Sequence, residues 1–568
     1  MISLRTPAGL LLLLGMPAAA ETYPAGEPVD EAVVVDLTPE GFDAVTDVLP
    51  TLLPSGISID PIGDGYEGAF GECWLGGYEY SLENMWIDLS VGDAAIVPHD
   101  GYISIDLDIN IAINDPSDPF ELYTMLECLD DTCDGYVDPF TVSASTIIDM
   151  RVVTGDDGLP GIEANVGDVS VDYTLSGTDI NLDNCAIGTV EDILNIFGLS
   201  IFDIVLSFAG GFIDDAVAGF IPEIEALIEE ATGTVYIEEE LDLGGAVAEL
   251  VIYPHEIRIR EEGLRLAMAG MVDAGEPADC IAEFDPGGSY HMASDTPDIG
   301  SGPGAHHAGI FLSDEFGNQA IYALWRAGLL CQVVDSELTG GISLDTNLLL
   351  GILAGESFKE LFPEPQPMVI LTRPAQSPEL VFSGANDVDL SIQQLGLDFY
   401  AELEHRQSRT IGVDLAADIG INLPFDGTTG TLALDLDLAG ENFDALVTHN
   451  DFVPSANADI EAALPGMVDT LVGPMVAGLL GETTFPLPAI EGLGLTAMSV
   501  DAAGDSADWL GLYASVGAVS YEAAGCDDES GGCDMGCGAV GPSPGRFALF
   551  GLPLFVVALR RRQERADS

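Results

Sequence analysis

One segment, Thr189 to Glu230, limits the possible folds more than any other part of the chain. Its sequence, TVEDILNIFGLSIFDIVLSFAGGFIDDAVAGFIPEIEALIEE, is too acidic to cross a bilayer and too apolar for an ordinary surface helix. Asp192, Asp203 and Asp214 recur every eleven residues, or three helical turns, so they form one narrow polar band. A surface helix usually has an apolar stripe only somewhat wider than about 100°. This helix therefore needs cover on most of its circumference, which either a packed protein core or an apolar ligand provides.

The charge balance excludes one class of partner. The chain has 15 Lys and Arg against 96 Asp and Glu, a net charge of −81. A field of this sign opposes binding to nucleic acid or to an anionic lipid surface through a basic patch. We expect a solvated acidic surface, with a calcium-loaded surface as the alternative.

The N-terminus has the pattern of a secretory signal peptide. Arg5 supplies the positive region, residues 10–16 form a short apolar run, and Ala18-Ala19-Ala20 is a small-residue cleavage site. The apolar run is too short to span a membrane. We predict export and a mature chain that begins near Glu21.

The C-terminal segment, residues 522–568, combines cysteines, a Gly/Pro/Ser spacer, a 13-residue apolar run (547–559) and a cluster of arginines. This order resembles the C-terminal sorting tails of myxobacterial surface proteins, in which a cysteine is the processing and lipid-anchoring site. Cys537 in "MGCG" fits that position best, and Cys533 is the alternative. The resemblance implies anchoring to a membrane surface, with an outer-membrane, cell-surface or extracellular location; a plain tail anchor is the other interpretation.

Six cysteines remain in the body of the chain: Cys73, Cys128, Cys133, Cys185, Cys280 and Cys331. An even number in an exported protein indicates disulfides. Cys128 and Cys133 are close enough in sequence to predict a local clasp, and the other pairings stay open. No C-x₂-C pair meets a histidine pair at the spacing of a zinc site.

The order of predicted elements repeats once. In the first half, a strand at 32–37 leads into a helix capped by Thr38, and strands follow with clear alternation from Ile103 to Ile111 before the long helix. A Gly/Pro/Ser-rich loop at 285–307 then marks the domain boundary. The second half has a helix near 314–328, strands, an amphipathic helix that begins near 457, and a closing strand that begins near 509. The sequence therefore predicts an internal repeat of element order.

Five stretches carry a resemblance to a known family, in the family's own order. They are AVVVDLTPEGFDAV, SLENMWIDLSVGDAAIVPHDGYISIDLDINIAI, GIFLSDEFGNQAIYALWRAGLL, TTFPLPAIEGLGLTAMSV and WLGLYASVGAVSY. Together they resemble the tubular lipid-binding (TULIP) superfamily, the family of BPI, LBP and CETP, over about residues 30–521. The resemblance implies an α+β fold of two elongated barrels joined by a central sheet. Each barrel is a highly twisted antiparallel sheet wrapped around a long helix.

The resemblance also implies a domain plan and has two departures. The plan is a signal peptide (1–20), an N-terminal barrel (21–285), a linker (286–304), a C-terminal barrel (305–521) and the tail (522–568). The endotoxin-binding members have a cationic tip, which this acidic chain lacks. The family's disulfide joins the first sheet to the long helix, whereas here the helix contains no cysteine and Cys185 lies just before it.

The function implied is the binding, or transfer, of phospholipid or another acyl-chain lipid between helix and sheet. No cofactor, metal or nucleic acid is expected. In the first barrel the expected lining residues are Phe42, Val45, Leu49, Ile193, Phe197, Phe202, Phe208 and Phe212. In the second barrel they are Phe316, Leu324, Leu464, Met467, Leu471 and Met475.

No convincing catalytic set is present, so we do not expect an enzyme. The segment HEIRI lacks the second histidine of a zinc protease motif, and Ser506 in GDSADW resembles a hydrolase nucleophile only superficially. His306-His307 is predicted as a solvated loop rather than a metal site, and residues 130–138 as an acidic surface loop rather than a calcium site. Two alternatives stay open: a structural or adhesive surface protein without lipid, and an exported hydrolase.

Overall fold

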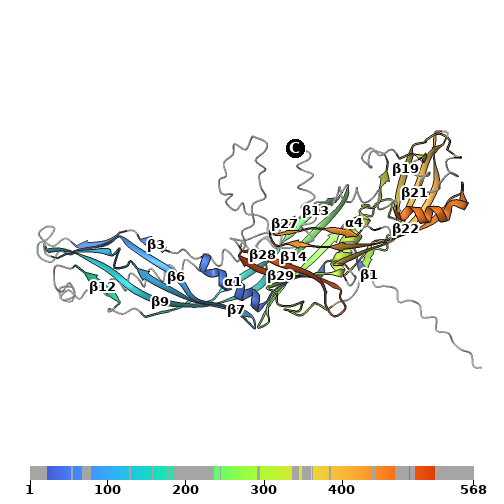
Figure 1. Ribbon diagram of the computed structural model, residues 1–568. Helices are drawn as coiled ribbons and strands as arrows, with labels where there is room; N and C mark the ends of the chain where they lie inside the picture. Colours follow the sequence, from blue (N-terminus) through green and yellow to red (C-terminus); the bar gives the residue numbers. More distant parts are fainter. Residues whose placement is uncertain are drawn as a thin grey trace, which may run out of the picture.

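Three antiparallel sheets follow one another along an elongated molecule in the computed structural model of the chain (Figure 1). The first and third sheets are curled half-barrels, and few helices accompany them. The described residues are 22–52, 56–59, 61–66, 78–126, 129–155, 158–174, 179–184, 236–243, 245–290, 295–335, 344–347, 360, 362–382, 386–403, 405–437, 439, 442–466, 485–486 and 493–518.

The first sheet has ten strands and is built around one very long strand, β9 (Leu129–Thr154). One edge of β9 pairs with β8 and β7, and the other edge pairs with β12, β11 and β10. The remaining strands continue outward on the side of β7 and β8. Their bounds are β3 (Gly56–Ile59), β4 (Ile62–Tyr66), β5 (Tyr78–Glu83), β6 (Met85–His99), β7 (Tyr102–Ile113), β8 (Phe120–Leu126), β10 (Pro160–Val166), β11 (Ser170–Tyr173) and β12 (Ile180–Asp183).

The central sheet is formed by both halves of the chain. Its seven strands have the order β13-β14-β15-β2-β17-β29-β28, and β2 of the first half pairs directly with β17 of the second half. This pairing agrees with the shared central sheet expected from the sequence. The bounds are β2 (Val29–Leu37), β13 (Ile237–Leu243), β14 (Ala246–Arg260), β15 (Gly263–Asp273), β17 (Ala308–Ser313), β28 (Leu493–Ala503) and β29 (Trp509–Ala518).

The third sheet also has seven strands, and β21 and β22 form its long central hairpin. Two small sheets complete the strand inventory of the described residues: β1 (Thr22–Pro24) with β16 (Gly288–Tyr290), and β23 (Phe425–Asp426) with β24 (Thr431–Leu432) and β27 (Phe485–Pro486). The strands of the third sheet are β18 (Val333–Val334), β19 (Met368–Pro374), β20 (Glu379–Val381), β21 (Val388–Leu403), β22 (Arg406–Asn422), β25 (Asp435–Asp437) and β26 (Phe443–His449).

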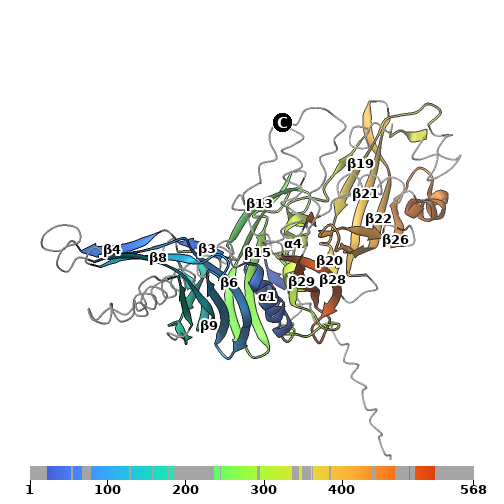
Figure 2. The ribbon, with the colours of Figure 1, turned by 60° about the vertical axis from the view of Figure 1, so that its left-hand side comes forward.

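Helix α1 (Pro39–Leu52) lies where the first and central sheets meet, against β6 and β29 (Figure 2). The Thr38 hydroxyl accepts a hydrogen bond from the Gly41 amide (3.2 Å) and donates one to the His306 carbonyl (2.6 Å). A Cβ on Gly41 would lie 2.2 Å from the His307 carbonyl oxygen, so only glycine fits there. The predicted cap is confirmed, and it also ties α1 to the segment that enters β17.

Helix α4 (Asp314–Arg326) packs on the central sheet and connects it to the third sheet. Ser313 caps it by accepting a hydrogen bond from the Phe316 amide, and Gly328 at φ +89° follows its C-terminal end. Gln319 accepts a hydrogen bond from Val272 N in β15, while Asn318 exchanges two hydrogen bonds with the backbone of Leu380 in β20. The helix predicted near 314–328 is therefore confirmed.

The two long helices of the predicted repeat have different outcomes. Residues 457–466 are helical, and Ile460 and Leu464 pack against Phe399 and Ile411 on the inner face of the third sheet. The start of the second long helix is thus confirmed. The first, Thr189–Glu230, lies outside the described residues and stays a prediction. In the part of the chain that is described, no helix is long and apolar enough to cross a membrane.

Two sequence-based interpretations are wrong. Residues 130–138 are not a surface loop: they belong to β9, and Asp131, Cys133 and Val137 are buried on one side of it. His306 is not solvated, because its ring is 5% exposed and packs edge-on against Tyr513, with centroids 4.9 Å apart. Sequence alone did not show that both segments are covered by parts of the chain distant in sequence.

One disulfide of the described residues joins Cys280 to Cys331, and Cys133 is also disulfide-bonded. The predicted Cys128–Cys133 clasp involves Cys128, which lies outside the described residues, so the described structure does not test it.

We predict that Cys133 pairs with Cys185. Asp183 in β12 is in register with Asp134, and the Asn184 side chain donates a hydrogen bond to the Asp134 carboxylate (2.6 Å), so the chain leaves β12 beside Cys133. Peptide mapping of unreduced protein by mass spectrometry should find the peptides containing Cys133 and Cys185 joined. A single peptide closed by a bond between Cys128 and Cys133 would contradict this register argument.

Candidate functional site

The inner face of the first sheet is apolar over three adjacent strands. On β7 the alternating residues Ile103, Ile105, Leu107, Ile109 and Ile111 all lie on this face, with polar residues between them. In register with them, β6 contributes Leu89 and Val91, and β9 contributes Phe140, Val142 and Ala144. Residues two apart on a strand share a face, so the alternation predicted from sequence produces one continuous apolar surface.

Two core clusters cover the ends of this surface. At the far end, the distal cluster contains Ile87, Ile111, Phe140 and Val142 together with side chains of β5 and β8. At the end nearest the central sheet, the junction cluster contains Phe42 of α1, Ile103 of β7 and Ile259 of β14. These contacts attach the first sheet firmly to the rest of the molecule.

Between the two clusters lies a third stretch of the same face, which we call the middle stretch. It consists of Val91, Ile105, Leu107 and Ala144, none of which belongs to the distal or the junction cluster. Val91, Ile105 and Ala144 are half-buried, while Leu107 is 6% exposed. The middle stretch therefore forms an apolar floor several residues long, with packed protein at both ends.

Few of the side chains predicted for the first pocket are described. Phe42 is 4% exposed and packs in the junction cluster, and Val45 is half-buried one turn further along α1. Leu49 lies in α1, but its side chain is outside the described part. The other predicted residues also lie outside it: Ile193, Phe197, Phe202, Phe208 and Phe212. Their role in holding a lipid stays a prediction.

The residues predicted for the second pocket lie in two different cores. Phe316 is 1% exposed and packs with Val29 and Val33 between α4 and the central sheet, and Leu324 borders the same core. Leu464 packs on the inner face of the third sheet with Phe399. The described structure therefore does not bring Phe316 and Leu464 into one core. Met467, Leu471, Met475 and the anchoring candidate Cys537 lie outside the described residues.

A buried ion pair lies in the central sheet. Arg265 on β15 donates two hydrogen bonds to Asp36 on β2, at 2.7 Å and 2.6 Å, and its guanidinium also donates to the Pro297 carbonyl (2.5 Å). Asp36 is fully buried and Arg265 is 5% exposed. Burial raises the pKa of the Asp36 carboxyl, and the hydrogen bonds and charge of Arg265 oppose that rise.

A second buried polar group contains two acids. Asp314, the first residue of α4, is 3% exposed, and its amide donates to the carbonyl of Asp508, which is 2% exposed. Burial, followed by repulsion from Asp508, raises the pKa of Asp314 to about 7. Among the described residues neither Asp508 carboxylate oxygen has a hydrogen-bond partner. The part of the chain that is described contains no group of three or more His, Cys, Asp or Glu able to hold a metal ion.

The middle stretch was not predicted from sequence, although its signal was present. Alternation on residues 103–111 identified an apolar face. It did not show which residues of that face would pack into a core cluster and which would lie between the clusters. That depends on strand register, and the bulge between Val91 and Ala94 shifts the register of β6 against β7.

Comparison with known proteins gives structural likeness only. The chain is similar to a lipopolysaccharide binding protein, with 14% identity and a TM-score of 0.48 over 87% of this chain and 100% of that one. It is also similar to P47 of Clostridium botulinum E1 (9% identity, TM-score 0.22, 86% and 100% covered) and to P47 from Clostridium botulinum A2 (8%, 0.22, 86% and 97%). No family model and no curated protein matches the chain. At these TM-scores the likeness says nothing about what the chain binds.

Proposed function

We propose that this chain is an exported lipid-binding protein that holds acyl chains against the inner face of its first sheet. The observation that carries the proposal is the middle stretch, an apolar floor between two packed clusters. The segment Thr189–Glu230 is the proposed roof, because its sequence needs apolar cover on most of its circumference. An acyl chain between floor and roof would cover both surfaces at once.

The chemistry of this site favours a binding protein over an enzyme. Each CH₂ group moved from water into an apolar site contributes about 0.8 kcal/mol, so a chain of a dozen carbons has enough driving force without any charged contact. The net charge of −81 supports a lipid site that recognises the acyl chain, rather than one in which basic residues bind an anionic headgroup. The Cys280–Cys331 bond is typical of exported proteins and supports secretion.

A variant of the floor tests the proposal without adding charge. Ala144 lies on the inner face of β9 in register with Leu107, so the change Ala144→Phe fills the middle stretch. We expect the affinity for a fluorescent fatty acid to fall at least five-fold in a displacement titration. The neighbouring exposed residue Ser145 lies on the other face, and Ser145→Phe is the matched control that adds the same bulk there.

The result that would contradict the proposal is equal fatty-acid affinity in the Ala144→Phe variant and the wild type, with both folded. Absence of fatty-acid binding in every variant, wild type included, would instead favour the structural or adhesive alternative, in which the long helix and the sheet seal against each other. Circular dichroism and the unfolding midpoint confirm that each variant retains its fold.

A further inference from the structure

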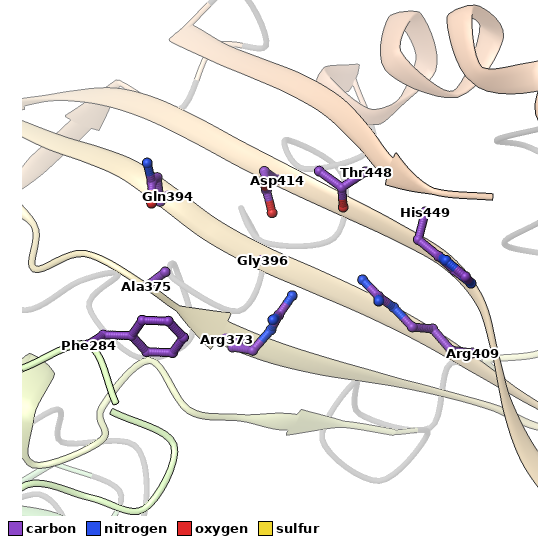
Figure 3. A pocket seen from close by; sticks show the side chains of 9 residues that line it. All are labelled: Phe284, Arg373, Ala375, Gln394, Gly396, Arg409, Asp414, Thr448 and His449. Carbon is purple, nitrogen blue, oxygen red and sulfur yellow. The ribbon is translucent and has the colours of Figure 1, made fainter. Parts of the chain in front are cut away.

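The outer face of the third sheet carries a cavity of about 350 Å³ that the proposed lipid site does not use (Figure 3). Strands β19, β21, β22 and β26 supply most of its walls, and Phe284 closes one side. The turn that contains Phe284 is fixed to the C-terminal end of α4 by the Cys280–Cys331 bond. The residues that line the cavity are Phe284, Arg373, Ala375, Gln394, Gly396, Arg409, Asp414, Thr448 and His449.

Two glycines of the sheet lie beneath the two arginines of the cavity, and Gly396 itself lines it. Gly396 lies between Arg373 and Asp414 in one cross-strand row, and Gly412 lies between Asp398 and His449 in the next. A Cβ on Gly412 would lie 2.1 Å from an Nη of Arg409, and one on Gly396 would lie 3.2 Å from an Nη of Arg373. Both guanidinium groups therefore lie directly over glycines of the sheet, and a side chain at either glycine would have to displace the guanidinium group above it.

The two arginines share one buried counter-ion. Asp398 is 9% exposed and contacts Arg409 at 2.5 Å and Arg373 at 3.6 Å. This single carboxylate cannot occupy all donors of two guanidinium groups, each of which has five. Among the described residues Arg409 Nε is buried without a hydrogen-bond partner. Figure 3 shows Arg373 and Arg409 reaching over the sheet toward the middle of the cavity. This arrangement suits a planar or tetrahedral oxyanion.

An acid faces the arginines from the other side of the cavity. Asp414 is separated from Arg373 by Gly396, which places their backbones two strand spacings apart, or about 10 Å. Its side chain is directed into the cavity (Figure 3). With Asp398 already paired, the cavity offers two guanidinium groups at one side and one carboxylate at the other.

The charge of the whole molecule selects among ligands for such a cavity. A net charge of −81 repels simple anions, and Asp414 adds a local repulsion. A ligand that carries its own cationic group avoids both penalties. We propose that the cavity binds a small zwitterion, whose oxyanion is held by Arg373 and Arg409 and whose ammonium group is held by Asp414. This site is separate from the proposed acyl-chain site and does not depend on it.

Phosphoethanolamine is the probe that tests this assignment, because it has a phosphate and an ammonium group joined by two carbons. In isothermal titration calorimetry with the full chain, we expect it to bind at least ten-fold more tightly than inorganic phosphate or ethanolamine. Arg409→Gln should weaken phosphoethanolamine at least ten-fold. Gly412→Ala should weaken it similarly without a change of charge, because the new methyl group displaces the Arg409 guanidinium.

Asp414→Asn separates the two halves of the proposal. It should weaken phosphoethanolamine and strengthen inorganic phosphate, so that the two affinities approach each other. The matched control is Arg406→Gln, on an exposed residue at the start of β22 that does not line the cavity, and it should leave both affinities unchanged. Thermal unfolding of each variant confirms that the third sheet remains folded.

The source of the zwitterion is a further outcome of the same experiment. Flotation with vesicles of phosphatidylethanolamine tests a lipid headgroup, and titration with free phosphoethanolamine tests a soluble molecule. Binding of either one, lost in Arg409→Gln, supports the site. Three results would overturn it: no binding of any probe, equal affinity of the wild type for phosphate and phosphoethanolamine, or full binding by Arg409→Gln.

Discussion

Replacing Arg265 with leucine is expected to lower the free energy of unfolding by about 3–5 kcal/mol. The change leaves Asp36 fully buried in the central sheet without the two hydrogen bonds it receives from the guanidinium. It also removes the bond to the Pro297 carbonyl, which holds the segment before β17. Unfolding in guanidinium chloride, followed by tryptophan fluorescence, measures this loss of unfolding free energy, because Trp509 lies on β29 of the same sheet.

Two further variants show whether this loss comes from an unpaired buried charge. Arg151→Leu removes an exposed ion pair with Glu163 on the first sheet, and it should lower the free energy of unfolding far less than Arg265→Leu because water already screens this pair. The double variant Asp36→Leu with Arg265→Leu should recover most of the stability lost in Arg265→Leu, because no charge then stays buried. A double variant as unstable as the single one would mean that packing, and not the charge of Asp36, accounts for the loss.

The change Asp314→Asn is expected to stabilise the protein at pH 8 and to have little effect at pH 4. Burial and the neighbouring Asp508 raise the pKa of Asp314 to about 7, against an ordinary value of 3.8. Between these two pH values the folded protein binds a proton that the unfolded chain has released. The contribution of the Asp314 carboxyl to the free energy of unfolding is therefore fully present below about pH 4, and it is lost as the pH rises toward 7. Asparagine mimics the protonated acid. At pH 8 the free energy of unfolding of Asp314→Asn should therefore exceed that of the wild type by about 2–4 kcal/mol.

The pH dependence of the difference between variant and wild type is the quantity to measure. Unfolding midpoints from pH 4 to pH 8 give it directly, and the effects of titrating groups that do not interact with Asp314 cancel in the comparison. Asp106→Asn makes the same change of side chain at an exposed position on β7, and it is the matched control against which the Asp314→Asn difference is compared. A flat difference for Asp314→Asn would show that the Asp314 carboxyl is ionised in the folded protein throughout this range.

Local sequence signals predicted the elements of this fold well. Thr38 predicted the start of α1, and alternation on 103–111 predicted an apolar face of β7, because caps and two-residue periodicity depend on neighbouring residues alone. The repeat of element order predicted that the two halves of the chain contain the same succession of elements. It did not specify that β2 pairs with β17. These two strands lie about 270 residues apart in the sequence, and their pairing depends on long-range strand register.

Contacts between distant segments account for what sequence did not predict. The Asp314–Asp508 pair joins α4 to a turn almost two hundred residues away, and neither acid was singled out from the sequence. The cavity depends on the register of four strands and on two guanidinium groups that lie over Gly396 and Gly412. A single glycine in a strand gives no indication of which side chain will occupy the space above it.

The central claim is that the first sheet holds acyl chains, and mass spectrometry of the purified protein tests it most directly. The protein is purified without added lipid, weighed under native conditions, and then extracted with organic solvent. We predict bound phospholipid or fatty acid in the wild type and in Ser145→Phe, and a loss of most of that mass in Ala144→Phe. A ligand-free wild-type mass, unchanged after incubation with phospholipid vesicles and fatty acids, would contradict the claim and favour the structural or adhesive alternative.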